Sequence, residues 1–223
     1  MKIVILGSGL MGPAAAFNSM NDPQVGQVLI GDASQAQLDA AMRKLAGKAG
    51  AEKLRPVRLD LNDQAAASEL MGDCDVVIAA LPRPASILGI RAALQAGVPL
   101  VDLTWPAEEH MPGLREEVEA AKGLIIPGCG VEPGLTEIMA RRLAEQLDRV
   151  DELHIKCGGI PETPTPPLGY KIVFGGKQLP LREQDGPTVE AGQLKLVPRY
   201  SGVESITFPG VGELEAWHET FMP

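Results

Sequence analysis

The sequence predicts an α/β fold, in which a doubly wound parallel sheet is followed by a second, partial α+β domain with a mainly antiparallel sheet. Up to residue 125, short apolar runs without polar alternation are separated by amphipathic stretches. This pattern is typical of parallel strands that helices cover on both faces. After residue 156, glycine and proline become denser and the apolar runs are joined by turns, which indicates a change of architecture.

The first part of the chain is expected to hold six strands and six helices. The expected strands are 3–6, 27–30, 55–59, 76–80, 99–103 and 124–126. The expected helices are 10–20, 35–46, 64–71, 85–95, 113–121 and 133–146. Asn62 or Asp63 is placed to cap the third helix, and Gly97 is placed to end the fourth.

In the last part of the chain, the sequence predicts short strands joined by turns. No helix is expected between Gly158 and Gly212. The expected strands are 152–157, 171–174, 193–197 and 205–208. We therefore divide the chain into a dinucleotide-binding domain at 1–125, a connecting loop and helix at 126–150, and a partial substrate or dimerisation domain at 151–223. Such a partial domain is expected to expose apolar surface.

Composition excludes several classes of protein. Of the 223 residues, 45% are hydrophobic and 22% are charged, which suits a packed core and argues against disorder. The net charge of −9 disfavours nucleic acid or an anionic membrane as the partner. No apolar stretch approaches the ~20 residues of a membrane span. The 3 cysteines are widely spaced without a CxxC pair, so we expect a reducing, cytoplasmic setting and no metal site.

A glycine-rich turn follows the first expected strand and opens the first helix. It has the spacing GxGxxG and consists of Gly7, Ser8, Gly9, Leu10, Met11 and Gly12. In a Rossmann fold, the first glycine permits the tight turn, the second lets the backbone approach a pyrophosphate, and the third lets the helix pack on the strand. The helix N-terminus then favours the bound anion.

Asp32 follows the second expected strand, twenty positions after Gly12, and Ala33 comes next. A carboxylate there accepts hydrogen bonds from the ribose hydroxyls and repels a 2′-phosphate, so NAD is the expected cofactor. NADP stays open, because a basic residue elsewhere can bind the phosphate. The alternative is a glycine-rich turn of another α/β fold, with Asp32 an incidental surface acid.

Two further strand ends belong to the expected cofactor site, because ligands of open α/β sheets bind at the carboxyl ends of strands. Asp60 and Leu61 follow the third strand, where the adenine is expected. Asp60 either accepts from the adenine amino group or caps the next helix. Ala80, Leu81 and Pro82 end the fourth strand, near the expected nicotinamide ribose.

Several phrases occur in the order found in one family. They are GSGLMG at 7–12, VVIAALP at 76–82, VDL at 101–103, GCGVEPG at 128–134, GGIP at 158–161, PLGYK at 167–171 and GELEA at 212–216. The glycine motif is common to many families, whereas the VEPG and GGIP…PLGY phrases are more specific. Together they resemble the saccharopine dehydrogenase family, especially its lysine 6-dehydrogenase and saccharopine reductase-like branch.

The resemblance implies an NAD(P)-dependent oxidoreductase of amino acid metabolism. Members of the family oxidise an amine of an amino acid such as lysine to an imine, or run that step in reverse. Their Rossmann domain holds the dinucleotide, and an inserted α+β domain covers the substrate and commonly forms a dimer contact. Family chains continue well past the GELEA phrase, so the resemblance implies a fragment or a short relative that lacks the C-terminal part.

Three residues are candidates for contact with the substrate. Asp102 ends the fifth strand, where it either lines the pocket or anchors its own loop. Glu132 precedes a helix, where it either orients a substrate ammonium group or acts as a capping acid. Tyr170 either faces the substrate cleft or packs as an aromatic. Cys129 is not expected to be a nucleophile, and no histidine forms a recognisable triad, so the base stays unassigned.

Three functional hypotheses follow. The first is an oxidoreductase acting on a C–N bond of a small-molecule amino acid, with a homodimer as the expected assembly. The second is a non-catalytic dinucleotide-binding protein. The third is a Rossmann enzyme of other chemistry, such as an epimerase or a homoserine-type dehydrogenase.

Overall fold

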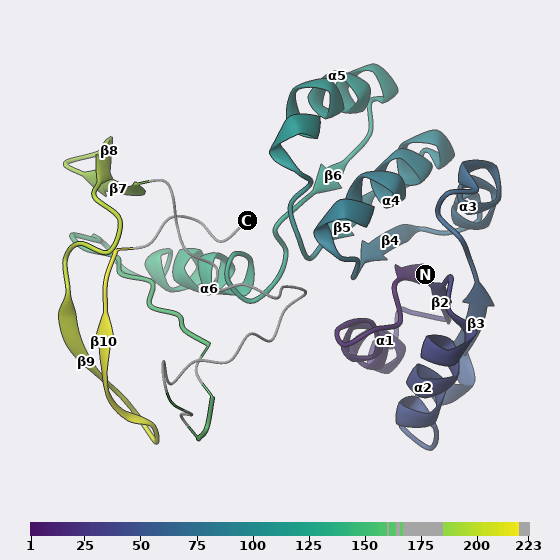
Figure 1. Ribbon diagram of the computed structural model, residues 1–223, viewed down its shortest axis with the longest axis horizontal. Helices are drawn as coiled ribbons and strands as arrows, with labels where there is room; N and C mark the ends of the chain where they lie inside the picture. The colour runs from purple at the N-terminus through teal and green to yellow at the C-terminus, as the bar shows by residue number, and fades with distance from the viewer. Residues whose placement is uncertain (160, 164–165, 167–184, 219–223) are drawn as a thin grey trace. The chain divides into compact units, whose positions relative to one another are not determined.

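The computed structural model describes residues 1–159, 161–163, 166 and 185–218 (Figure 1). The chain divides into two compact units, Met1–Gly134 and Leu135–Pro223. The first unit thus extends past residue 125 and includes the loop after the last parallel strand. Each unit is described by itself.

The first unit is built on a six-stranded sheet with the order β3-β2-β1-β4-β5-β6. Its strands are β1 (Lys2–Leu6), β2 (Gln27–Asp32), β3 (Leu54–Arg58), β4 (Val76–Ala79), β5 (Leu100–Asp102) and β6 (Ile125–Ile126). All neighbouring strands pair in parallel. The order reverses direction at β1 and β4, which is the switch point of a doubly wound sheet. The predicted α/β fold is confirmed.

Helices cover both faces of this sheet (Figure 1). They are α1 (Gly12–Asn21), α2 (Gln35–Leu45), α3 (Gln64–Gly72), α4 (Arg83–Ala96) and α5 (Met111–Ala121), with short 3-10 turns η1 (Ala51–Lys53) and η2 (Glu108–His110). Alternate side chains of strand β1 pack into two hydrophobic clusters, one on each face of the sheet. Ile3 and Ile5 join a cluster with α1 and α2, whereas Val4 and Leu6 join a cluster with α3, α4 and α5.

The helix boundaries follow local chemistry. Asp63 caps α3, since its carboxylate accepts a 3.1 Å hydrogen bond from the amide of Ala66. Gly97 ends α4 in the left-handed conformation, with φ of +70°. Helix α4 begins two residues before the expected position, because Pro84 fits the first turn, where its missing N–H costs nothing.

The second unit contains one helix and two antiparallel hairpins among its described residues. The elements are α6 (Leu135–Ala144), β7 (Gly186–Glu190), β8 (Gln193–Val197), β9 (Glu204–Phe208) and β10 (Gly212–Ala216). β7 pairs with β8 and β9 with β10, so the expected strands at 193–197 and 205–208 are confirmed. The expected strand at 171–174 lies outside the described residues.

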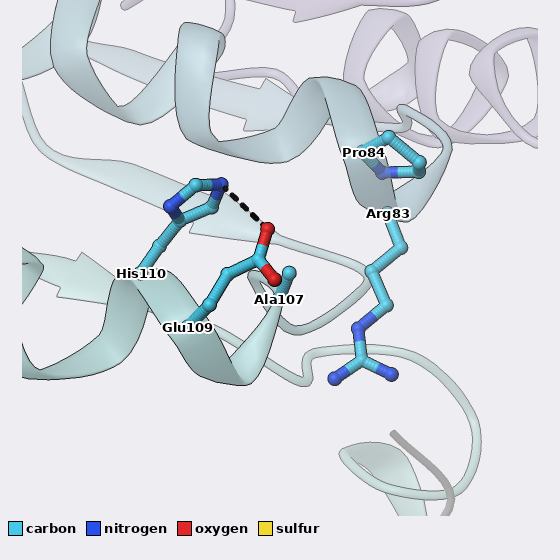
Figure 2. A pocket seen from close by; sticks show the side chains of 5 residues that line it. All are labelled: Arg83, Pro84, Ala107, Glu109 and His110. Atoms are coloured by element: carbon cyan, nitrogen blue, oxygen red, sulfur yellow. Dashed lines mark ion pairs between the residues drawn. The ribbon is translucent and has the colours of Figure 1, made fainter.

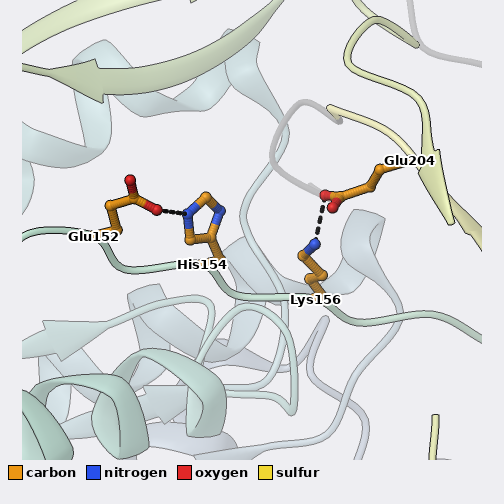
Figure 3. Close-up of polar contacts among 4 residues, drawn as sticks. All are labelled: Glu152, His154, Lys156 and Glu204. Carbon is orange, nitrogen blue, oxygen red and sulfur yellow. Dashed lines mark hydrogen bonds and ion pairs between the residues drawn. The ribbon is translucent and has the colours of Figure 1, made fainter. Parts of the chain in front are cut away.

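The strand expected at 152–157 is wrong. Its apolar residues alternate as in a strand, yet none of the described strands pairs with this segment. Figure 3 shows two polar contacts of this segment. Lys156 forms an ion pair with Glu204 of β9, and His154 Nε2 lies 3.2 Å from Glu152 Oε2. Apolar alternation alone does not make a strand, because the segment must also pair through its backbone with a neighbouring strand.

The described part of the second unit has no buried hydrophobic side chain. Leu194 and Leu196 of β8 are 73% and 70% exposed, and Ile138 of α6 is 66% exposed. All buried hydrophobic residues described lie between Ile3 and Leu114. The expected exposure of apolar surface in the second domain is therefore confirmed for these residues.

Candidate dinucleotide and substrate site

The glycine-rich loop after β1 contains two positions that require glycine. Gly7 has φ of +91°, and a Cβ there would lie 2.5 Å from the carbonyl oxygen of Ala80. A Cβ on Gly12 would lie 2.0 Å from the carbonyl oxygen of Gly7. The first glycine thus permits close approach of β4, and the last permits α1 to pack directly on the turn.

Gly9, the middle glycine, has a different environment. A Cβ at Gly9 would meet no atom within 4 Å, so the space above it is open. The neighbouring apolar side chains are exposed, Leu10 at 67% and Met11 at 39%. An open backbone position followed by exposed apolar side chains fits the close approach of a dinucleotide.

Asp32 braces this loop from the end of β2. Its Oδ2 accepts hydrogen bonds from both the amide and the hydroxyl of Ser8, each at 2.8 Å. Its Oδ1 accepts from the amide of Ser34 at 2.8 Å. A carboxylate has about four acceptor positions, so one remains for a ribose hydroxyl. Ala33, the next residue, is exposed. The bracing of Ser8 was not expected from the sequence.

Asp60 lies after β3 and forms a local turn. Its Oδ1 accepts from the amide and the side-chain amide of Asn62, at 2.9 and 2.8 Å. These bonds lower the pKa of Asp60. The expectation that Asp60 caps the next helix is wrong, because Asp63 is the cap. Leu61 packs against the core. Contact of Asp60 and Leu61 with an adenine stays a prediction.

The end of β4 lies beside the glycine-rich loop. The amide of Ala80 donates to the carbonyl of Leu6 at 2.8 Å, and Ala80 faces the Cα of Gly7. Pro82 is the N-cap residue of α4. The structure therefore brings Ala80, Leu81 and Pro82 to the same edge as Gly7, while their contact with a cofactor stays a prediction.

Asp102 is fully buried at the end of β5. Its Oδ2 accepts from the hydroxyl of Ser86 on α4, and its Oδ1 accepts from the amide of Thr104 at 2.9 Å. Burial raises the pKa of Asp102 and outweighs the opposing effect of these two hydrogen bonds. The arrangement is that of a loop anchor. A direct contact with substrate stays a prediction.

The loop after β6 is bound to the loop after β5. The amide of Cys129 donates to the carbonyl of Asp102 at 2.8 Å, and that of Gly128 to the carbonyl of Thr104 at 3.0 Å. Gly128 has φ of +70°, and a Cβ there would lie 2.4 Å from Nε1 of Trp105. Burial, and then the charge of Asp102, raise the pKa of the Cys129 thiol. A protonated thiol is a poor nucleophile.

Glu132 and Tyr170 complete the predicted set. Glu132 lies in the turn between Gly130 and Gly134, where the amide of Gly130 donates to the carbonyl of Pro133 at 2.8 Å. It precedes α6, which begins at Leu135 rather than at the expected residue 133. Both roles considered for Glu132 stay predictions. Tyr170 lies outside the described residues.

A cavity near this edge includes residues that sequence reasoning missed. It is a hollow that is open to solvent, with a volume of about 470 Å³, and Figure 2 shows its lining. The lining residues are Arg83, Pro84, Ala107, Glu109 and His110. Arg83 had a signal in the sequence, because it directly follows the strand-ending Leu81-Pro82. Glu109 and His110 had no such signal, since they lie between the strand expected at 99–103 and the helix expected at 113–121, where the sequence pattern predicts no element.

No group of three His, Cys, Asp or Glu side chains is arranged to hold a metal ion among residues 1–159, 161–163, 166 and 185–218. In that same part of the chain, no helix combines the length and the hydropathy needed to cross a membrane.

Known proteins similar to this chain include two fungal enzymes. The saccharopine dehydrogenase [NADP(+), L-glutamate-forming] of Schizosaccharomyces pombe is 25% identical over 134 residues, which are 57% of this chain and 30% of that protein. The enzyme of the same name from Saccharomyces cerevisiae is 25% identical over 186 residues, 79% of this chain and 39% of that protein. The chain therefore spans 30% to 39% of the length of these relatives.

A solved structure and a family model agree with these relatives. The apo saccharopine dehydrogenase (L-Glu forming) from Saccharomyces cerevisiae superposes with a TM-score of 0.61 at 18% identity, covering 94% of this chain and 47% of that chain. This likeness shows a shared fold. The family model described as saccharopine dehydrogenase NADP binding domain matches residues 3–125. This match covers more than half of the chain, so the chain belongs to the saccharopine dehydrogenase NADP-binding-domain family.

Proposed function

We propose that the chain is an NAD(P)-dependent oxidoreductase that acts on a C–N bond of an amino acid. The observation that carries the proposal is the open backbone at Gly9, on the carboxyl edge of a sheet that matches the family over residues 3–125. The similar fungal proteins are named as saccharopine dehydrogenases. They support an amine or imine as the reacting group.

Each residue group has a distinct part in this proposal. A bound nicotinamide dinucleotide supplies the hydride acceptor or donor. Gly9 lets the pyrophosphate approach the backbone, and Asp32 uses its remaining acceptor position for a ribose hydroxyl. Asp102 is a positioning residue, because it is fully buried and both carboxylate oxygens accept hydrogen bonds from the protein's own groups. Cys129 stays protonated near neutral pH.

We also propose that the chain prefers NAD(H) to NADP(H). Asp32 accepts three hydrogen bonds, but no cation within the described residues forms an ion pair with it. Its negative charge therefore opposes a 2′-phosphate. The exposed Arg58 is the strand neighbour of Asp32. Arg58 is the residue through which NADP(H) would still bind, in keeping with the family's description.

The experiment combines binding with turnover. The purified chain is titrated into NADH and into NADPH while the fluorescence of the cofactor is followed. In a second measurement, lysine, saccharopine and related diamino acids are added to the chain together with the oxidised cofactors. We expect tighter binding of NADH than of NADPH, and reduction of NAD by one of these amines. Binding without turnover of any amine would instead support the non-catalytic hypothesis.

A charge-matched pair of variants tests the role of Asp32. Asp32→Asn is expected to weaken NADH binding about tenfold and to reduce the preference over NADPH. Asp39→Asn on α2 removes the same charge from an exposed position and is expected to change neither. Equal effects of the two variants would show that the ribose assignment is wrong.

Self-association through the second unit is part of the proposal. Its exposed apolar side chains on α6 and β8 support burial against a second copy. Light scattering is expected to give the mass of a homodimer, and a monomer at micromolar concentration would contradict it.

A further inference from the structure

The cavity between the start of α4 and η2 contains opposite charges that are not paired with each other. Arg83 contributes a guanidinium and Glu109 a carboxylate to the same lining (Figure 2). The carboxylate of Glu109 lies 3.7 Å from His110 Nε2 and is 79% exposed. Within the described residues, no carboxylate forms an ion pair with Arg83.

Arg83 also has a buried donor that lacks an acceptor. Its Nε atom is buried, and no group among the described residues accepts a hydrogen bond from it. A buried polar group without a partner is costly, so native proteins supply one from the protein, from water or from a ligand. A carboxylate suits a guanidinium especially well, because its two oxygens can accept two parallel N–H bonds.

The position of Arg83 connects the cavity with the cofactor edge. Arg83 follows Pro82 directly, and Ala80 packs on Gly7 of the glycine-rich loop. The cavity therefore opens close to the strand end at which the nicotinamide ribose is proposed. A ligand held there lies on the side of β4 and β5, where hydride transfer would occur.

We propose that this cavity binds the head group of an α-amino acid, with its carboxylate on Arg83 and its ammonium group on Glu109. The inference rests on the proposed function for the choice of an amino acid. A simple anion fits less well, because Glu109 repels it, and a simple amine leaves Arg83 unpaired. A zwitterion satisfies both charges at once.

The test uses L-norleucine as a zwitterionic probe, with hexanoate and hexylamine as probes that each lack one charge. The readout is the Arg83 Nε–H signal in a ¹H–¹⁵N spectrum, assigned by its loss in Arg83→Gln. Norleucine is expected to shift this signal at lower concentration than either control probe. Equal shifts with norleucine and hexanoate would overturn the proposal, as would displacement of norleucine by inorganic phosphate.

Variants of the two charged residues give a second test, in which one variant is expected to change the affinities of two probes in opposite directions. Arg83→Gln is expected to weaken norleucine binding about tenfold. Glu109→Gln is expected to weaken norleucine but to strengthen hexanoate, because the repulsion is removed. Arg91→Gln, an exposed arginine of the same helix that pairs with Glu117, is the matched control. An equal loss in Arg91→Gln would contradict the assignment.

A parallel titration separates this inference from the proposed function. If NADH does not bind while norleucine still shifts the Arg83 signal, the proposed function fails and the head-group site stands. If NADH added by itself shifts the Arg83 signal, and if NADH also displaces bound norleucine, the cavity binds the cofactor and the inference fails.

Discussion

In the loop after β1, substitution of Gly7 is expected to lower the stability of the fold, whereas substitution of Gly9 is expected to weaken cofactor binding. In Gly7→Ala, the new methyl group would lie 2.5 Å from the carbonyl oxygen of Ala80 at a φ of +91°. The left-handed backbone costs about 1–2 kcal/mol, and the crowding costs about 1–3 kcal/mol. Gly7→Ala is therefore expected to lose about 2–5 kcal/mol of unfolding free energy.

Gly9→Ala is the contrasting variant. A Cβ at Gly9 meets no protein atom within 4 Å, so the unfolding free energy is expected to change by less than about 0.5 kcal/mol. The methyl group occupies the space through which a pyrophosphate approaches the backbone. NADH affinity is therefore expected to fall by at least about tenfold, which corresponds to about 1.4 kcal/mol.

The assay is urea unfolding followed by the fluorescence of Trp105 in a Trp217→Phe background, so that the signal reports on the first unit. With a denaturant slope of about 2 kcal/mol per molar, the midpoint of Gly7→Ala is expected about 1–2.5 M below that of the parent. Gly9→Ala is expected to unfold with the parent. Parent-like NADH affinity in Gly9→Ala, or parent-like stability in Gly7→Ala, would refute the reasoning.

Three further predictions concern the strand ends of β5 and β6. Ser86→Ala removes a donor to the fully buried carboxylate of Asp102, so urea unfolding is expected to show a loss of about 1–3 kcal/mol. Burial raises the pKa of Asp102 above its ordinary value of 3.8, so the folded state binds this proton more tightly than the unfolded state. The free energy of unfolding is therefore expected to fall as the pH rises from 3.8 through the raised pKa of Asp102. In Asp102→Asn, the free energy of unfolding measured over the same pH range is expected not to show this fall. Iodoacetamide is expected to alkylate the exposed Cys157 before Cys129, whose thiol pKa is raised by burial; faster labelling of Cys129 in a mass spectrum would contradict this.

Periodic features of the first unit could be predicted from the sequence. Apolar runs marked all six strands, and the glycine spacing located the loop after β1, because these patterns depend on local geometry and on burial. Asp63 and Gly97 also acted as expected at the helix ends. Such positions are decided by interactions within a few residues of the chain.

Features that depend on distant partners could not be predicted. The bond from Ser8 to Asp32 and the pairing of Ser86 with Asp102 join residues far apart in the sequence. Residues 152–157 have strand alternation, but they pair with none of the described strands. The role proposed for Arg83 depends on a cavity whose other wall comes from η2, and sequence spacing does not define such a wall.

The central claim is that a dinucleotide binds at the carboxyl edge of the parallel sheet. Backbone ¹H–¹⁵N spectra of the chain, recorded while NADH is added, test it most directly. We expect shifts at Gly9, Asp32 and Ala80, at the carboxyl edge, and none at Gly26 and Asp75, which precede β2 and β4 at the opposite edge. An unchanged spectrum, or shifts confined to the opposite edge, would contradict the claim.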